Sequence, residues 1–229
     1  MMDSVLAQAP AFFSAGNIAF VLAALWRTIA MTAIGCSLGF VFGLGIAILR
    51  RSTIGWLAPA RWLAALYVET FRRVPFLVIL IMALFALQPV APQLSLLAIA
   101  TIAVTLVATA FLSETIRGGL DSVPRQQWEG AAALNFGAWH TLVRVMLPQA
   151  MRVILPPASA FVVMFVKDTS LASHLGVVEL TFSGKILVNR GFSPVLGFGV
   201  ILVLYFALSW PLSIAAARLE KRLAAPRHR

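Results

Sequence analysis

Charged residues are scarce in this sequence. Only 11% of its 229 residues are Asp, Glu, Lys or Arg, whereas soluble domains carry about 25%. Acidic residues are the scarcest, with eight in all, and the mean hydropathy is +0.93. A water-soluble globule of this size cannot bury an apolar fraction of 61%. These shortages exclude a soluble enzyme, a disordered chain and a secreted disulfide scaffold, and they leave an integral membrane protein.

Cysteine, metal-ligand sets and nucleotide motifs are also lacking. The single cysteine, Cys36, lies in an apolar run and has no partner for an intrachain disulfide. Three histidines at 140, 174 and 228 are too scattered for a metal site. Lys185 follows Gly184, but Glu179 stands where a phosphate-binding loop needs glycine. We therefore expect no catalytic residues, no metal and no cofactor bound by this chain. Nucleic acid is not expected as a partner either, because the basic residues form no stripe with interleaved aromatics.

Long apolar runs dominate the chain and predict an all-α membrane protein. About five transmembrane helices are expected within a single domain over 1–229, at about 18–49, 75–90, 94–115, 148–168 and 194–216. The second run is short for a span. Either a helix begins earlier and kinks at Pro75, or an interfacial helix over 56–71 precedes a short span that starts there. A mixed loop is expected over 171–193.

Small residues repeat on one face of the first run. Gly35, Gly39 and Gly43 are four residues apart, which places them on one side of a helix where another helix can approach closely.

Basic residues are unevenly distributed between the expected loops. The connector 50–73, the stretch 117–152 and the tail after 217 hold 14 of the 18 Lys and Arg, and alternation of five spans puts these three regions on one side. The positive-inside rule then predicts an N-terminus outside and a C-terminus in the cytoplasm of a multi-pass protein.

The segment 122–148 is the most polar internal stretch. Ser122 is expected to cap a short helix over 125–134, with Pro124 in its first turn. Asn135 and Gly137 accept left-handed geometry and are expected to break this helix, and a second one over 138–147 is expected to stop at Pro148. Two interpretations stay open from these features: a docking element for a soluble partner, or an interfacial hairpin lying on lipid.

Part of this segment resembles the "EAA" loop of bacterial ABC importer permeases. That pattern is Glu-Ala-Ala, three residues, Gly, nine residues, Ile-x-Leu-Pro. The chain has Glu129-Gly130-Ala131, then Asn135, then Val145-Met146-Leu147-Pro148 at the same spacing. Three positions differ: Gly130, Asn135 and Val145.

Further motifs narrow the resemblance to the polar amino-acid permeases, the histidine/glutamate/glutamine/arginine/opine type. They follow in order as Glu69–Pro75 (ETFRRVP), Glu114–Gly119 (ETIRGG), Val123–Glu129 (VPRQQWE), Leu147–Ala150 (LPQA) and Lys167–Leu171 (KDTSL). Together with the loop they cover about residues 65–185.

The resemblance implies a permease subunit that forms the translocation path for a polar amino acid in the bacterial inner membrane. It implies a cytoplasmic ATPase dimer that binds the ATP, a periplasmic or lipid-anchored substrate-binding protein, and either a homodimer or a homologous second permease within membrane lipid. It assigns coupling to the ATPase to the loop residues Glu129, Gly130, Ala131, Ala132, Asn135, Gly137, Leu147 and Pro148. A passive channel or a non-ABC secondary transporter is the alternative.

Ionisable residues near membrane depth need a partner or water. Glu114 and Arg117 are three residues apart on one helix face and are expected to form a structural pair. The cluster Lys167, Asp168 and Thr169 offers a cation for a carboxylate and an acceptor for an amine, so it is a candidate for the substrate path. Helix termination and subunit packing are the competing explanation for these three residues.

Overall fold

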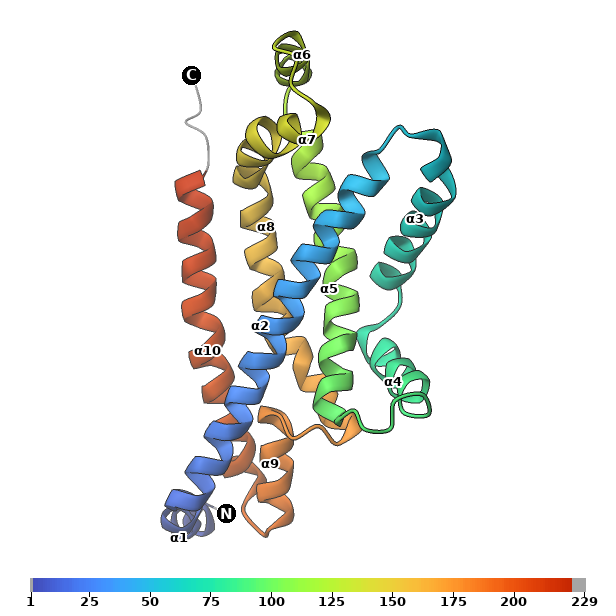
Figure 1. The fold of residues 1–229 in the computed structure, drawn as a ribbon. Helices are drawn as coiled ribbons and strands as arrows, with labels where there is room; N and C mark the ends of the chain where they lie inside the picture. Colours follow the sequence, from blue (N-terminus) through green and yellow to red (C-terminus); the bar gives the residue numbers. More distant parts are fainter. Residues whose placement is uncertain (1, 224–229) are drawn as a thin grey trace. The chain divides into compact units, whose positions relative to one another are not determined.

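The computed structural model describes residues 2–223 and contains no strand in that range. Arg227, His228 and Arg229, which enter the charge and metal-site arguments above, lie outside the described residues. The helices run in the order α1 (Met2–Phe12), α2 (Ala15–Arg51), η1 (Gly55–Leu57), α3 (Ala58–Arg73), α4 (Phe76–Leu87), α5 (Leu96–Asp121), α6 (Arg125–Ala133), α7 (Ala138–His140), η2 (Thr141–Met146), α8 (Leu147–Asp168), η3 (Thr169–Leu175), α9 (Leu180–Asn189) and α10 (Pro194–Leu223) (Figure 1).

Four helical segments are long and apolar enough to cross a membrane: Ala15–Arg51, Leu96–Asp121, Ala138–Leu175 and Pro194–Leu223. A fifth span arises if the bent pair Gly55–Arg73 and Phe76–Leu87 is counted as one, with 118° between its two parts. The expected all-α fold with about five transmembrane helices is therefore confirmed.

The break at Pro75 makes α3 and α4 separate helices. Pro75 is extended, with ψ 137°, and directly precedes α4. Proline has no N–H to continue a helix and pushes the preceding residue out of helical geometry. The structure thus has a distinct helix before a short apolar one, instead of one gently kinked helix.

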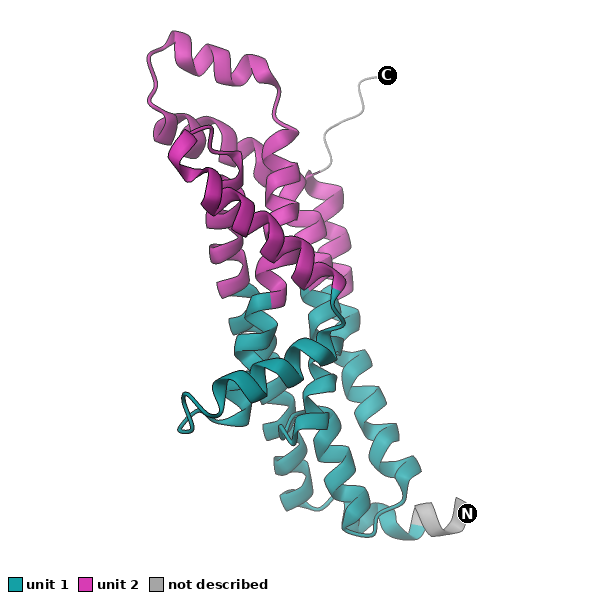
Figure 2. Cartoon of the chain, turned by 90° about the vertical axis from the view of Figure 1, so that its right-hand side faces the viewer, with its two compact units in different colours: residues 1–37, 74–106, 162–212 teal, residues 38–73, 107–161, 213–229 magenta. Residues whose placement is uncertain are grey.

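The chain forms two compact units, coloured separately in Figure 2, and α2, α5, α8 and α10 contribute residues to both. Unit 1 comprises 1–37, 74–106 and 162–212. Its core gathers Phe12, Val21, Leu180, Leu187 and Ile201, all buried. Gly184 of α9 is part of this packing, because a Cβ there would lie 2.9 Å from Ile201 of α10.

Unit 2 comprises 38–73, 107–161 and 213–229. Here the expected close approach at the glycine face is found: a Cβ on Gly39 would lie 2.6 Å from the Cβ of Ala108, and one on Gly43 would lie 3.0 Å from the backbone nitrogen of Ser113. The absence of side chains on this face of α2 allows α5 to pack directly on its backbone.

Two expectations about helix ends are wrong. Pro148 does not stop a helix: α7, η2 and α8 run on continuously, and the N–H of Leu147 donates to the carbonyl of Leu142, five residues back. The π-helical turn η2 adds room ahead of Pro148, whose ring would otherwise crowd the carbonyl of the preceding turn. The expected loop over 171–193 instead holds η3 and α9, and α10 continues to Leu223.

Candidate functional site

The polar segment after α5 is built around a sharp end of α6. Asn135 has φ 60°, and its N–H donates to the carbonyl of Ala132 at 2.9 Å, while the N–H of Phe136 donates to that of Ala131 at 3.0 Å. These two bonds around a left-handed residue are a Schellman motif. Asn135 therefore ends the helix in the way expected from the sequence. Gly137 does not share this role, because its φ is −66°.

The start of α6 differs from expectation. The residue before it is Pro124, with no side-chain cap. The Ser122 hydroxyl donates back to the carbonyl of Gly119 at 2.7 Å, so Ser122 is not the cap.

An exposed apolar surface marks the end of α6 and the following turn. Leu134, Phe136 and Trp139 are 71%, 43% and 68% exposed, and the small side chain of Ala132 is exposed next to them. Ala131, by contrast, is buried and anchors the helix. Large apolar groups that remain exposed outside a lipid-facing span indicate a surface for another protein or for the membrane interface.

The segment is held to the rest of unit 2 by packing and one polar contact. Helix α6 packs against η2. The Gln149 amide, one residue beyond Pro148, donates to the Gln127 side chain at 3.2 Å and to the carbonyl of Val145 at 2.8 Å. Leu147 and Pro148 thus lie at the point where the segment joins α8.

Glu129 is the fifth residue of α6, beyond its first turn. The helix dipole does not explain an acid at this position, since that effect is confined to the terminal turn. Glu129 instead forms an ion pair with Arg125 at 2.9 Å, and both side chains are largely exposed. Such a pair adds little stability. Gly130 beside it has open space around its Cα, which leaves this side of the helix accessible.

Five charged side chains form a network where α2 and α5 end. Glu114 accepts from Arg50 at 2.7 Å and from Nε of Arg117 at 3.2 Å. Arg117 also contacts Asp121 at 2.7 Å, and Asp121 pairs with Arg51. The pair Glu114–Arg117 is thus one link in a chain of three arginines and two carboxylates. Sequence reasoning missed Arg50 and Arg51, because their pairs with Glu114 and Asp121 join residues 64 and 70 positions apart. It also missed Asp121, although the spacing of four residues from Arg117 is a local signal for that pair.

We expect Glu114→Ala to lower the free energy of unfolding by about 1–3 kcal/mol, because it leaves two partly buried guanidiniums without their shared carboxylate. Arg50 is only 17% exposed. The measurement is the melting temperature of the detergent-solubilised protein. Glu69→Ala is the matched control, since it removes an exposed i,i+4 pair with Arg73 and should change stability by less than about 1 kcal/mol. Equal melting temperatures for the two variants would contradict the prediction.

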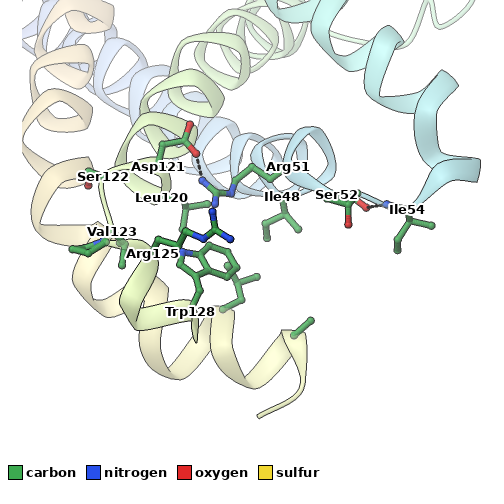
Figure 3. Close-up of a pocket in the computed structure, with 14 residues that line it drawn as sticks. Ile48, Arg51, Ser52, Ile54, Leu120, Asp121, Ser122, Val123, Arg125 and Trp128 are labelled. Atoms are coloured by element: carbon green, nitrogen blue, oxygen red, sulfur yellow. Dashed lines mark hydrogen bonds and ion pairs between the residues drawn. The ribbon is translucent and has the colours of Figure 1, made fainter. Parts of the chain in front are cut away.

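A cavity of about 830 Å³ lies beside this network in unit 2. It is lined by the end of α2, the connector after it, the end of α5 and the start of α6 (Figure 3). Arg51 is central: it pairs with Asp121, and its guanidinium lies 5.0 Å from the ring centre of Trp128. A single side chain therefore joins α2 to α5 and to α6.

The three candidate path residues lie together in unit 1, at the junction of α8 and η3. Lys167 is exposed and Asp168 is half-buried. Thr169 is buried, and its hydroxyl donates to the carbonyl of Val166 at 2.8 Å. The charged pair is thus accessible to a ligand, whereas the Thr169 hydroxyl is engaged with its own helix.

A buried carboxylate that the sequence did not reveal lies at the start of α9. Glu179 is fully buried, caps α9 by accepting from the N–H groups of Thr181 and Phe182, and accepts from the Tyr205 hydroxyl at 2.9 Å. Burial raises the pKa of the Glu179 carboxyl, and these hydrogen bonds oppose that shift. Nearby, Arg27 donates to the carbonyl of Val178, and Thr28 accepts from the N–H of Leu180. This polar cluster ties α9 to α2 and α10 within unit 1.

The fold defines a multi-pass membrane protein with a polar helical segment, 122–148, between two of its spans. Residues 39–225 match the family described as binding-protein-dependent transport system inner membrane component, and the chain belongs to this family.

Two sequence relatives and two solved structures match nearly the whole chain. The chain is 34% identical over 213 residues to the probable glutamine ABC transporter permease protein GlnP of Bacillus subtilis, covering 92% of this chain and 96% of that protein. It is 32% identical to the glutamate transport system permease protein GluD of Corynebacterium glutamicum, and the match covers 92% of this chain and 77% of that protein. Among solved structures, an amino acid ABC transporter with histidines has a TM-score of 0.79 and 24% sequence identity, and the match covers 90% of this chain and 94% of that one. The MetNI methionine ABC transporter in an inward-facing conformation has a TM-score of 0.80 and 21% sequence identity, and the match covers 93% of this chain and 100% of that one.

The protein is therefore the transmembrane permease subunit of an ABC importer in the inner membrane, and not a passive channel or a secondary transporter. A permease of this kind works with a separate ATPase and a substrate-binding protein, and the ATPase activity belongs to that partner.

Proposed function

We propose that this permease carries a polar amino acid of the amide or basic kind. The observation that supports this most is the 34% identity, over nearly its full length, to a permease named for glutamine. A second relative, GluD, is named for glutamate, which is acidic, so it supports a polar amino acid and not the amide or basic kind in particular. The accessible pair Lys167 and Asp168 suits a zwitterionic substrate, because it presents a cation and a carboxylate side by side. Two permease chains would enclose the path, as a homodimer or with a homologous second permease.

In this proposal the segment 122–148 docks on the ATPase. Its contact residues are Glu129, Gly130, Ala132, Asn135 and Gly137. The buried Ala131 supports this surface from inside, and Leu147 and Pro148 connect the segment to α8. Supporting this are the exposed Leu134, Phe136 and Trp139, and the accessible side of α6 at Gly130.

The proposed orientation places the C-terminus in the cytoplasm, as the distribution of basic residues predicts. A reporter fused after Arg229 is expected to be active only if it is of the kind that works in the cytoplasm. The measurement is a paired fusion to an export-dependent and a cytoplasm-dependent reporter. Activity of the export-dependent fusion would contradict the proposed location of the C-terminus.

The function is tested by uptake into vesicles that contain the permease, its ATPase and its binding protein. We expect ATP-dependent accumulation of glutamine or of a basic amino acid, and none of leucine. Accumulation without ATP, or none of any polar amino acid, would contradict the proposal.

Within that assay, Asp168→Asn is expected to lower uptake about ten-fold, the size of one lost hydrogen bond to a charged group. Assembly with the ATPase should stay unchanged, because Asp168 and the docking segment belong to different units. Asp168→Glu keeps the charge and is the control. Normal uptake by Asp168→Asn would contradict a path role for this residue and leave the family assignment untouched.

A further inference from the structure

The cavity beside the charge network combines basic groups with apolar walls. Arg51 and Arg125 line it together with Asp121, and the apolar side chains of Ile48, Leu120 and Leu142 form much of the remaining wall. Its volume of about 830 Å³ lies in the range of ligand sites in proteins, about 300–1,000 Å³. The cavity is therefore large enough for an amphipathic ligand with one anionic end.

The charges around the cavity leave a positive excess. Arg50, Arg51 and Arg117 share the two carboxylates of Glu114 and Asp121, which leaves one positive charge uncompensated. The remaining pair, Arg125 and Glu129, is neutral as a pair, with Nε of Arg125 2.9 Å from Oε1 of Glu129. The Arg125 side chain is 89% exposed, so its guanidinium is accessible to a ligand.

Guanidinium groups with free N–H donors bind phosphate well, because their planar fork matches two phosphate oxygens. Arg51 is held in place by Asp121 and by the ring of Trp128, so its orientation is fixed before any ligand arrives. Arg125 is exposed and free to turn toward a bound phosphate. The two arginines can therefore serve together as ligands for one phosphate group.

The cavity lies where a headgroup would be found. Arg51 is the last residue of α2, the helix that carries the first apolar span. The next two helices along the chain, η1 and α3, display Trp56 and Trp62, which are 80% and 66% exposed. Tryptophan is enriched at the membrane–water interface, and the cytoplasmic leaflet carries anionic lipids. A soluble anion would have no use for the apolar walls at Ile48 and Leu120.

We propose that this cavity binds the phosphate of an anionic phospholipid of the cytoplasmic leaflet, with Arg51 and Arg125 as its ligands and the apolar wall against its acyl chains. The leaflet assignment rests on the orientation proposed above. Bound there, the lipid would bridge the end of α2 and the start of α6, the helix proposed to dock on the ATPase.

The test measures lipid retained by the complete transporter after detergent delipidation and titration with phosphatidylglycerol or phosphatidylcholine, by native mass spectrometry. We expect preferential retention of phosphatidylglycerol, and about ten-fold weaker retention in Arg125→Gln, which removes one charge-assisted contact. Because Arg125 is exposed, this variant should fold normally. Leu142→Trp fills the cavity and should also lose the lipid.

Two control variants distinguish a specific lipid site from a general effect of positive charge on lipid retention. Arg144→Gln removes a positive charge from an exposed position of η2 that does not line the cavity, and Glu129→Gln removes the ion-pair partner of Arg125 while keeping the guanidinium. Both should retain phosphatidylglycerol.

Unchanged retention in Arg125→Gln, or equal loss in Arg144→Gln, would overturn the proposal. So would displacement of the lipid by inorganic phosphate, which would indicate a site for a soluble anion. Loss of the ATPase from Arg125→Gln with lipid unchanged would assign the cavity to the docking surface instead. Retention is measured without ATP or amino acid, so a failure of the uptake assay would contradict the proposed function and not this site.

Discussion

Ala132→Arg is expected to abolish ATP-driven uptake while the protein still inserts into the membrane. Ala132 is an exposed, small side chain next to the apolar Leu134 and Phe136. In the proposed complex an arginine here would be buried against the ATPase without a carboxylate, which costs several kcal/mol. The co-purified ATPase should therefore fall at least about ten-fold. The measurement is ATPase recovery on the tagged permease, together with uptake by vesicles.

Asn135→Pro should have the same consequence for a different reason. Proline fixes φ near −65°, whereas Asn135 has φ 60° and donates its N–H to Ala132. The substitution thus removes the Schellman turn and redirects the chain after α6. The spans are not touched, so insertion should remain normal.

Controls at the same two positions make the test specific. Ala132→Ser keeps the small volume, and Asn135→Gly keeps access to left-handed geometry. Both should retain the ATPase and uptake. If Ala132→Arg and Asn135→Pro also retain both, the segment 122–148 is not the docking element.

The parts of this site that depend on local chemistry can be predicted from the sequence. Asn135 is recognisable as a helix-breaking residue because few residue types accept positive φ, and it has φ 60°. The face formed by Gly35, Gly39 and Gly43 is recognisable from a spacing of four, and a Cβ at any of the three would crowd α5. In both cases the local geometry accepts few residue types, so the residue itself indicates the geometry.

The parts that depend on distant residues cannot be predicted in this way. Arg50 and Glu114 are 64 residues apart, so nothing in the local pattern pairs them. Glu179 gives no capping signal, because it lies outside the usual set of Ser, Thr, Asp and Asn, and without that signal the sequence around α9 predicts a loop. Pro148 predicts a helix end, but the π-helical turn before it accommodates the ring.

Gly39→Val is expected to destabilise unit 2 by forcing α2 and α5 apart. A Cβ at this position would lie 2.6 Å from the Cβ of Ala108 and 3.0 Å from the backbone nitrogen of Thr109. A backbone atom in a packed helix cannot move aside, so the two helices must separate. Overpacking of this kind costs about 1–3 kcal/mol, and in a chain of this length each kcal/mol lowers the melting temperature by about 2–4 °C.

Gly45→Val is the matched control for this prediction. It lies on the same helix and makes the same change in side chain and helix propensity, but a Cβ there meets nothing within 4 Å. Its melting temperature should stay close to that of the unmodified protein, measured on detergent-solubilised material. If the two variants melt at the same temperature, the close approach of α2 and α5 does not hold unit 2 together. If only Gly39→Val melts early, the loss comes from that contact, because the two substitutions share every other effect on the helix.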